Sequence, residues 1–102
     1  MSSRMAQTQW TFMTSYGAVL LYVANHPRET MRRIAERLGL TERTAARILH
    51  HLQEEDYVYV HKEGRRNIYE VNKEKPLKDL AYADHKVEDF LRLLDPEYWI
   101  GA

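Results

Sequence analysis

The stretch IAERLGLTERTAARILHHL (residues 34–52) places a single glycine, Gly39, between two short runs of apolar residues at helical spacing. A threonine precedes each run, Thr30 before the first and Thr41 before the second, and its hydroxyl can accept the free N–H groups of a first helical turn. Gly39 suits the left-handed conformation that often follows the end of a helix. The pattern therefore predicts two short helices, the second running from Thr41 to about Glu55, which cross closely at a three-residue turn.

The second of these helices is predicted to carry arginines on its exposed side. Its expected buried stripe consists of Ala45, Ile48, Leu49 and Leu52. Arg43 and Arg47 are four residues apart and share the opposite face. Two helices joined by a short turn are typical of the helix-turn-helix, whose second helix lies in the major groove of DNA. An arginine there bonds the O6 and N7 edge of guanine or holds a phosphate, so this face is a candidate DNA-binding surface.

A further helix is predicted before this pair, so the arginine-bearing helix after Thr41 is the third helix in chain order. Residues 10–26 place apolar side chains at helical spacing, and Pro27 ends the pattern. Because the segment is nearly apolar all round, we expect it to be heavily buried. Its possible N-caps are Thr11, Thr14 and Ser15.

A β-hairpin is predicted after the pair. The runs YVYVH (57–61) and NIYEV (67–71) are rich in β-branched and aromatic residues, which is typical of strands. Gly64 between them supplies the positive φ that a short hairpin loop needs. Arginine at such a tip can enter a narrow, electronegative minor groove. The expected basic residues of the tip are Lys62, Arg65 and Arg66.

The segment after Pro76 carries a second apolar stripe, which Pro96 ends. Asp84 occupies one position of this stripe, which steps alternately by three and four through positions 77, 80, 84, 87, 91 and 94. Such spacing lets two helices pack side by side and predicts a C-terminal dimerisation helix over residues 76–96. The alternative is that this helix packs on its own domain. The expected dimer-interface residues are Leu77, Leu80, Ala83, Val87, Phe90, Leu91 and Leu94.

The order of these elements resembles a known class of DNA-binding domain, the winged helix. The motifs WTFMT, IAERLGLTERTAARIL and EGRRNIYEVN followed by PL are similar to those of small bacterial and archaeal winged helix-turn-helix transcriptional regulators of the MarR and ArsR type. The resemblance covers residues 10 to about 94. It implies a dimeric, sequence-specific DNA-binding protein whose C-terminal helix contributes to the dimer. The chain lacks the cysteine metal motif of many ArsR-type sensors, so ligand sensing is not inferred from the resemblance.

The predicted fold class is α+β and mostly α. It is a winged helix-turn-helix, with a three-helix core and a β-hairpin wing, followed by the C-terminal dimerisation helix. The expected organisation is a flexible tail over residues 1–9, the DNA-binding domain over 10–75, the helix over 76–96 and a second tail over 97–102.

The expected function is sequence-specific binding of double-stranded DNA by a transcriptional regulator. A homodimer would read the major groove with the third helix and the minor groove or the backbone with the wing. The expected DNA contacts are Thr30, Arg32, Arg33, Thr41, Glu42, Arg43, Thr44, Arg47, His50, Lys62, Arg65 and Arg66. The alternative is a winged-helix module that binds protein or RNA. A protein-binding module should present apolar residues on the outer face of the third helix, where this chain has arginine, threonine and histidine.

The formal net charge of the 102 residues is zero, which by itself does not favour a nucleic-acid partner. The charge is unevenly distributed, however. Residues 28–66 hold nine basic and seven acidic residues, whereas residues 67–102 hold five basic and eight acidic ones. Local placement of charge matters more for phosphate binding than the total, so the basic middle stays a candidate nucleic-acid surface.

Composition and motifs also exclude several classes of protein. The chain has no cysteine, which excludes a disulfide framework and a thiolate zinc site and makes a reducing cytoplasm the expected location. No apolar run is long enough to span a bilayer, and no nucleophile, phosphate-loop or paired-acid motif indicates an enzyme. Asp84, His85 and Glu88 offer half of a zinc or nickel site, but a solvated polar stretch is the preferred interpretation. We expect no metal, no cofactor and no membrane partner, and the sequence names no small-molecule effector.

Overall fold

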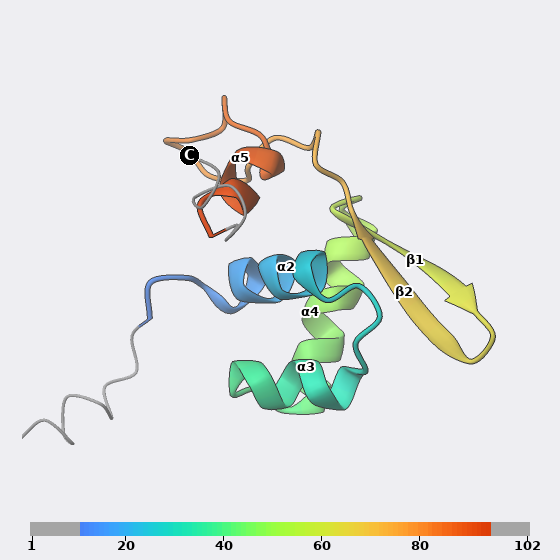
Figure 1. Ribbon diagram of the computed structural model, residues 1–102. Helices are drawn as coiled ribbons and strands as arrows, with labels where there is room; N and C mark the ends of the chain where they lie inside the picture. Colours follow the sequence, from blue (N-terminus) through green and yellow to red (C-terminus); the bar gives the residue numbers. More distant parts are fainter. Residues whose placement is uncertain (1–10, 95–102) are drawn as a thin grey trace, which may run out of the picture.

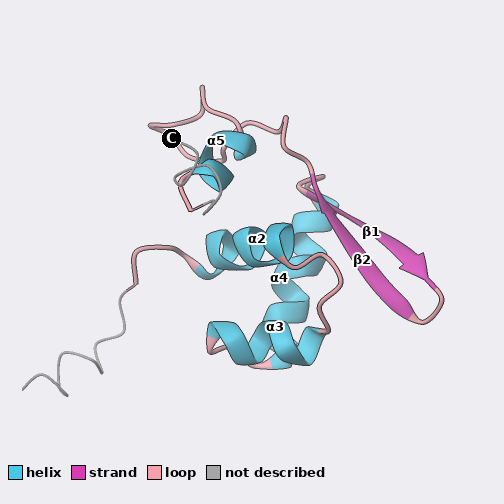
Figure 2. Cartoon of the chain, in the orientation of Figure 1, coloured by secondary structure: helices cyan, strands magenta, loops and turns pink. Residues whose placement is uncertain are grey.

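The computed structural model describes residues 11–94, which form three helices, a β-hairpin and one further short helix (Figures 1 and 2). The elements are α2 (Ser15–Asn25), α3 (Met31–Leu38), α4 (Glu42–Glu54), β1 (Val58–Glu63), β2 (Arg66–Val71) and α5 (Val87–Arg92). The predicted winged helix-turn-helix, with its three-helix core and two-stranded wing, is confirmed. Trp10, Pro96 and the predicted tails over 1–9 and 97–102 lie outside the described residues.

Helix α2 begins later than the apolar pattern predicts. Thr14 is its N-cap, and the Thr14 hydroxyl accepts the backbone N–H of Gly17 at 3.2 Å. The predicted helical residues 11–14 are not helical, because Thr14 has an extended backbone and the helix begins only at Ser15. Phe12 therefore lies outside the helix and is 96% exposed. Within α2 the expected burial is confirmed for Val19, Leu20, Leu21 and Val23.

The turn between α3 and α4 has the predicted structure. The hydroxyls of Thr30 and Thr41 each accept a backbone N–H from the first turn of the helix that follows, at 3.2 and 3.0 Å. Gly39 has a φ of +68°, in the left-handed region where glycine is strongly favoured. The N–H of Leu40 then donates to the carbonyl of Ala35 at 2.9 Å, which closes the end of α3. These caps place the start of α4 directly beside the end of α3.

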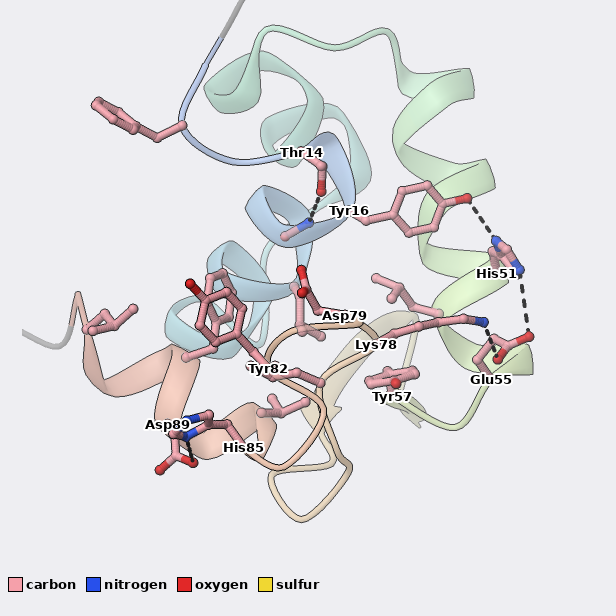
Figure 3. A pocket seen from close by; sticks show the side chains of 18 residues that line it. Thr14, Tyr16, His51, Glu55, Tyr57, Lys78, Asp79, Tyr82, His85 and Asp89 are labelled. Carbon is pink, nitrogen blue, oxygen red and sulfur yellow. Dashed lines mark hydrogen bonds and ion pairs between the residues drawn. The ribbon is translucent and has the colours of Figure 1, made fainter.

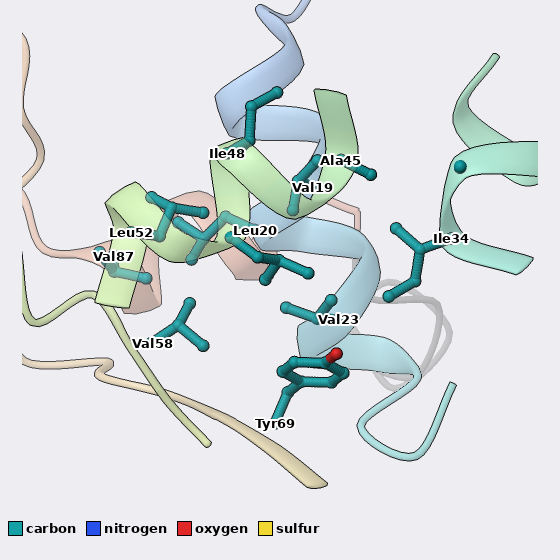
Figure 4. Packing of buried hydrophobic residues seen from close by; sticks show 12 residues of the cluster. Val19, Leu20, Val23, Ile34, Ala45, Ile48, Leu52, Val58, Tyr69 and Val87 are labelled. Atoms are coloured by element: carbon teal, nitrogen blue, oxygen red, sulfur yellow. The ribbon is translucent and has the colours of Figure 1, made fainter. Parts of the chain in front are cut away.

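The hydrophobic core lies where α2, α3, α4 and the hairpin meet (Figure 4). Ile34 of α3 and Ile48 of α4 are 0% and 1% exposed. Burial of one such side chain stabilises the fold by about 1.5–3 kcal/mol. The predicted buried stripe of α4 is confirmed in full. The clustered core residues are Val19, Leu20, Val23, Ile34, Ala35, Ala45, Ile48, Leu49, Leu52, Val58, Tyr69 and Val87.

The wing is a tight antiparallel hairpin that projects from the helices (Figure 1). Its register runs from Val58 opposite Val71 to Glu63 opposite Arg66, so only two residues form the loop. Gly64, the first of them, has a φ of +63°, as a type II′ turn requires and as the sequence predicts. The N–H of Tyr69 donates to the carbonyl of Pro27 at 2.8 Å, and an ion pair joins Arg28 to Glu63. These bonds attach the wing to the loop after α2.

The single helix predicted over 76–96 is wrong, because in the described part of this segment, residues 76–94, helix is confined to α5, Val87–Arg92. Residues 77–85 form a loop instead, closed where the N–H of Leu77 donates to the carbonyl of His85 at 2.9 Å. The N–H of Val87 donates to the carbonyl of Lys75 at 2.8 Å. These bonds use backbone groups that a longer helix would pair internally, and they bring Val87 into the core. Helix α5 thus lies on the side of α2 opposite α3 (Figure 1).

Candidate nucleic-acid interface

The outward face of α4 carries the two arginines that the sequence analysis singled out. Arg43 and Arg47 are exposed, because the buried stripe of the helix lies on the other side. Neither arginine forms an ion pair with a residue in the described range 11–94. Their guanidinium groups are therefore not occupied by carboxylates of the described residues. An arginine pair in this state can form bidentate hydrogen bonds with a base edge or a phosphate.

The first turn of α4 adds hydroxyl groups beside the arginines. The hydroxyl of Thr41 donates to the Thr44 hydroxyl oxygen at 2.9 Å while it caps the helix. Thr44 accepts that bond, so its own hydroxyl hydrogen is left to donate elsewhere. Glu42 is also exposed in this turn, where its charge favours the helix N-terminus and where it can accept a hydrogen bond from cytosine N4.

His50 lies one turn after Arg47 and is partly engaged. Its Nε2 lies 3.3 Å from a carboxylate oxygen of Glu54, in an exposed pair four residues apart along the helix. Such exposed pairs are weak, so they do not hold the imidazole firmly. His50 therefore marks the point where the basic half of α4 gives way to its acidic end.

Helix α3 supplies a second group of cations. Arg32 and Arg33 are exposed, and Thr30 is exposed but serves as the helix cap. Burial raises the pKa of Tyr22, and its hydrogen bond to Glu29 at 2.8 Å raises that pKa further. The charges of Arg37 and Arg33 oppose this shift. Arg32 is also exposed, and its charge is not among the causes of the Tyr22 pKa shift.

The wing presents its cations on both faces. Lys62 and Arg66 lie in the strands, and Arg65 lies in the turn. Cross-strand partners share a face, so Lys62 lies with Asn67 on one face while Arg66 lies opposite Glu63 on the other. Glu63 forms its ion pair with Arg28. None of the three wing cations pairs with a carboxylate of the described residues 11–94.

One residue of the wing was missed by the sequence analysis. Asn67 has a buried side-chain oxygen with no hydrogen-bond partner in the described part of the chain. A buried polar atom of this kind is costly to leave unpaired. Nothing in the local pattern distinguishes Asn67, since asparagine is common near hairpin turns.

The predicted dimer-interface residues differ in how far they are buried. Val87 is 0% exposed and belongs to the core of its own chain, so its predicted role in a dimer is wrong. Leu77 and Leu91 pack against that core from the outside. Leu80 is fully exposed and Leu94 is 53% exposed. The remaining two are the exposed Ala83 and the half-buried Phe90.

The described residues 11–94 hold no group of three or more His, Cys, Asp and Glu side chains suited to a metal ion. His85 instead lies 3.5 Å from Asp89, in an exposed pair on the C-terminal segment. No helix of this range is long and apolar enough to cross a membrane. Each of the predicted DNA contacts lies on α3, α4, the cap residues before them or the wing.

Comparison with known proteins agrees with this arrangement. Residues 17–61 match the IclR helix-turn-helix domain. Among solved structures, the chain is similar to MepR, a transcription regulator of the Staphylococcus aureus multidrug efflux pump MepA, with a TM-score of 0.54 and 20% sequence identity. The similarity covers 87% of this chain and 63% of the MepR chain, so this chain spans less than two thirds of that protein. No curated protein sequence matches the chain significantly.

The comparisons also refine the sequence interpretation. The matched range runs from α2 into β1 and includes the helix-turn-helix pair and its short turn. The matching family is the IclR type, so the MarR or ArsR type that the sequence motifs resemble is not confirmed. At 20% identity the similarity to MepR supports the fold alone, which in this chain is a winged helix-turn-helix.

Proposed function

We propose that this protein is a transcriptional regulator that binds double-stranded DNA sequence-specifically as a homodimer. The observation that carries the proposal is the outward face of α4, where Arg43 and Arg47 are exposed and form no ion pair with described residues. In a helix-turn-helix, this face of the second helix enters the major groove. The match to a helix-turn-helix domain and the fold shared with a transcription regulator support it.

The wing and α3 complete the proposed contact surface. Arg65 and Arg66 would reach the minor groove or the backbone beside the major-groove contact. Arg32 and Arg33 would hold phosphates at the entrance of α3. The caps Thr30 and Thr41, with Glu42, Thr44, His50 and Lys62, would complete the set. No catalytic group is part of this proposal, and the expected location stays the cytoplasm.

The dimer is proposed on the exposed part of the C-terminal segment. Leu80, Ala83 and Leu94 are the predicted interface residues that remain exposed. A two-fold axis beside them would present two copies of α4 to successive major-groove faces, about 34–36 Å apart. Two linked modules bind more tightly than one, because the second contact forms at a high effective concentration.

Fluorescence anisotropy with a labelled duplex, selected from a random pool and scanned over salt, tests the DNA proposal. Protein cations release counterions from DNA, so we expect affinity to fall steeply as salt rises. The double change Arg65→Ala and Arg66→Ala should weaken binding to most sequences and reduce the slope of log K against log salt by about 2 units, if both contact phosphates.

Arg92→Ala is the matched control, because Arg92 is an exposed arginine on α5 that pairs with Glu88 at 3.1 Å. It should leave both affinity and slope unchanged. Absence of duplex binding at any salt concentration would contradict the proposal. Equal binding of RNA and DNA would instead support the RNA-binding alternative.

A further inference from the structure

A groove of about 880 Å³ lies away from the proposed DNA-binding face, between α2, the last turn of α4 and the segment after Pro76 (Figure 3). Most of its lining is apolar, with Leu20 and Leu52 on one side and Leu77 and Val87 on the other. A concave apolar site of this size is in the range that holds a small organic molecule.

The three walls of the groove are joined by a chain of polar contacts. Tyr16 of α2 shares a hydrogen bond of 2.8 Å with Nδ1 of His51 on α4. Nε2 of His51 lies 3.8 Å from Glu55, and the other carboxylate oxygen of Glu55 accepts from Nζ of Lys78 at 3.2 Å. Figure 3 shows these contacts along one side of the groove. They tie the segment after Pro76 to α4 and so hold the walls of the groove in place relative to one another.

Aromatic side chains supply a large share of the groove lining. They come from the residues before α2, from α2 itself, from the turn between α4 and β1 and from the C-terminal segment, and they are Phe12, Tyr16, Tyr57, Tyr82 and Phe90. The face of an aromatic ring carries partial negative charge and attracts a cation. Walls of this kind therefore suit a ligand with both an apolar body and a positive charge.

The charges of the lining favour the same class of ligand. Three carboxylates line the groove, from Glu55, Asp79 and Asp89, together with the ammonium group of Lys78 and the imidazoles of His51 and His85. His85 lies 3.5 Å from Asp89. Lys78 is already paired with Glu55. The backbone N–H of Lys86, which Asp89 accepts at 3.0 Å, holds the pKa of Asp89 below its usual value and keeps it ionised at neutral pH.

Asp79 is the carboxylate whose charge is least compensated. It accepts the backbone N–H of Ala81 at 3.1 Å and forms no ion pair with the described residues 11–94. In Figure 3 its carboxylate points toward the middle of the groove, with Tyr16 and Tyr82 on either side in that view. A carboxylate in a groove that aromatic rings also line is suited to binding a substituted ammonium group.

We propose that this groove binds a small organic cation, a substituted ammonium compound with an aromatic or alkyl body, and that its charged end lies beside Asp79. The apolar body would occupy the lining around Leu20, Leu77 and Phe90. This site is separate from the DNA contacts proposed on the first turns of α4. Its occupation needs no nucleic acid.

Three probes that share one ring system test the charge preference. They are (1-naphthylmethyl)trimethylammonium, 1-naphthalenemethanol and 1-naphthylacetate, followed by calorimetric titration of the full chain without DNA. We expect the cation to bind about tenfold more tightly than the neutral alcohol, because the charge gains both the aromatic faces and the carboxylates. The anion should bind most weakly.

Asp79→Asn removes the charge and keeps an oxygen for the N–H of Ala81. It should weaken binding of the cation about fivefold to tenfold and leave binding of the alcohol within about twofold. Asp84→Asn is the matched control, because Asp84 is an exposed carboxylate of the same loop that does not line the groove. It should change neither affinity.

Circular dichroism of each variant establishes that it is folded. Should Asp79→Asn unfold, Tyr82→Leu provides the second test, with a selective loss of cation binding expected. Equal affinity for the three probes would overturn the proposal. So would an absence of binding at about 1 mM probe, a concentration at which even weak ligands occupy a real site. Because no DNA is present, these outcomes are independent of the proposed regulatory function.

Discussion

The helix-turn-helix and the segment after Pro76 use their apolar residues in different ways. In α3 and α4 the apolar residues face the core, and charged residues face outward. In the C-terminal segment Val87 is fully buried, whereas Leu80, Leu93 and Leu94 are more than half exposed. The helix-turn-helix is thus complete within one chain. The C-terminal segment retains apolar surface, which is where contacts with further molecules are expected.

The largest expected effect of a single substitution is a loss of stability in the core of the helix-turn-helix. Ile48→Ala should lower the free energy of unfolding by about 2–5 kcal/mol, because Ile48 is 1% exposed and its loss leaves a cavity under α4. Leu80→Ala removes a similar side chain from full exposure and should change stability by less than about 0.5 kcal/mol.

Urea denaturation of both variants, monitored by circular dichroism, measures the difference. The Leu80 variant should be compared at low protein concentration, where an associated state contributes least. Similar losses for the two variants would show that residue 80 is packed, and the contrast between the two regions would then fail.

A smaller effect is expected on self-association. Leu80→Glu together with Leu94→Glu should shift the protein from dimer to monomer in sedimentation velocity, because two charges would be forced into an apolar contact. Gln53→Glu, at an exposed position of α4, is the control and should leave the dimer intact. A monomeric wild-type protein at tens of micromolar, or an unchanged dimer in the double variant, would place the exposed leucines outside any interface between copies.

The same two regions show how far the sequence predicts the structure. For α3 and α4 the local signals agree with one another: Thr30 and Thr41 cap, Gly39 turns, and the apolar spacing has a core to face. The structure follows the prediction there to within a residue or two. After Pro76 the apolar spacing alone indicated a helix, with no cap near Leu77.

The structure of the C-terminal segment depends on hydrogen bonds between residues that are not neighbours in the sequence. The carbonyls of Lys73 and Lys75 take the N–H groups of Glu88 and Val87, and the core admits Val87 alone of the predicted stripe. Apolar periodicity cannot distinguish these tertiary bonds from a longer helix. The groove was missed for the same reason, since its contact between α2 and α4 joins residues 35 positions apart. The predicted DNA contacts on α4 are polar and lie outside its buried stripe, because that stripe was predicted correctly; all are exposed except Thr44, which is half-buried.

Selection of bound sequences from a random duplex pool, with the wild-type protein and with Arg47→Ala, tests directly whether α4 reads the bases of DNA. If Arg47 reads a base edge, the variant should lose about 1–3 kcal/mol on the preferred site and accept other bases at one position of each half-site. Arg92→Ala, which alters an exposed and paired arginine on α5, should select the wild-type sequence. We expect this selective loss of base preference, whereas an unchanged affinity and an unchanged selected sequence for Arg47→Ala would contradict base recognition by α4.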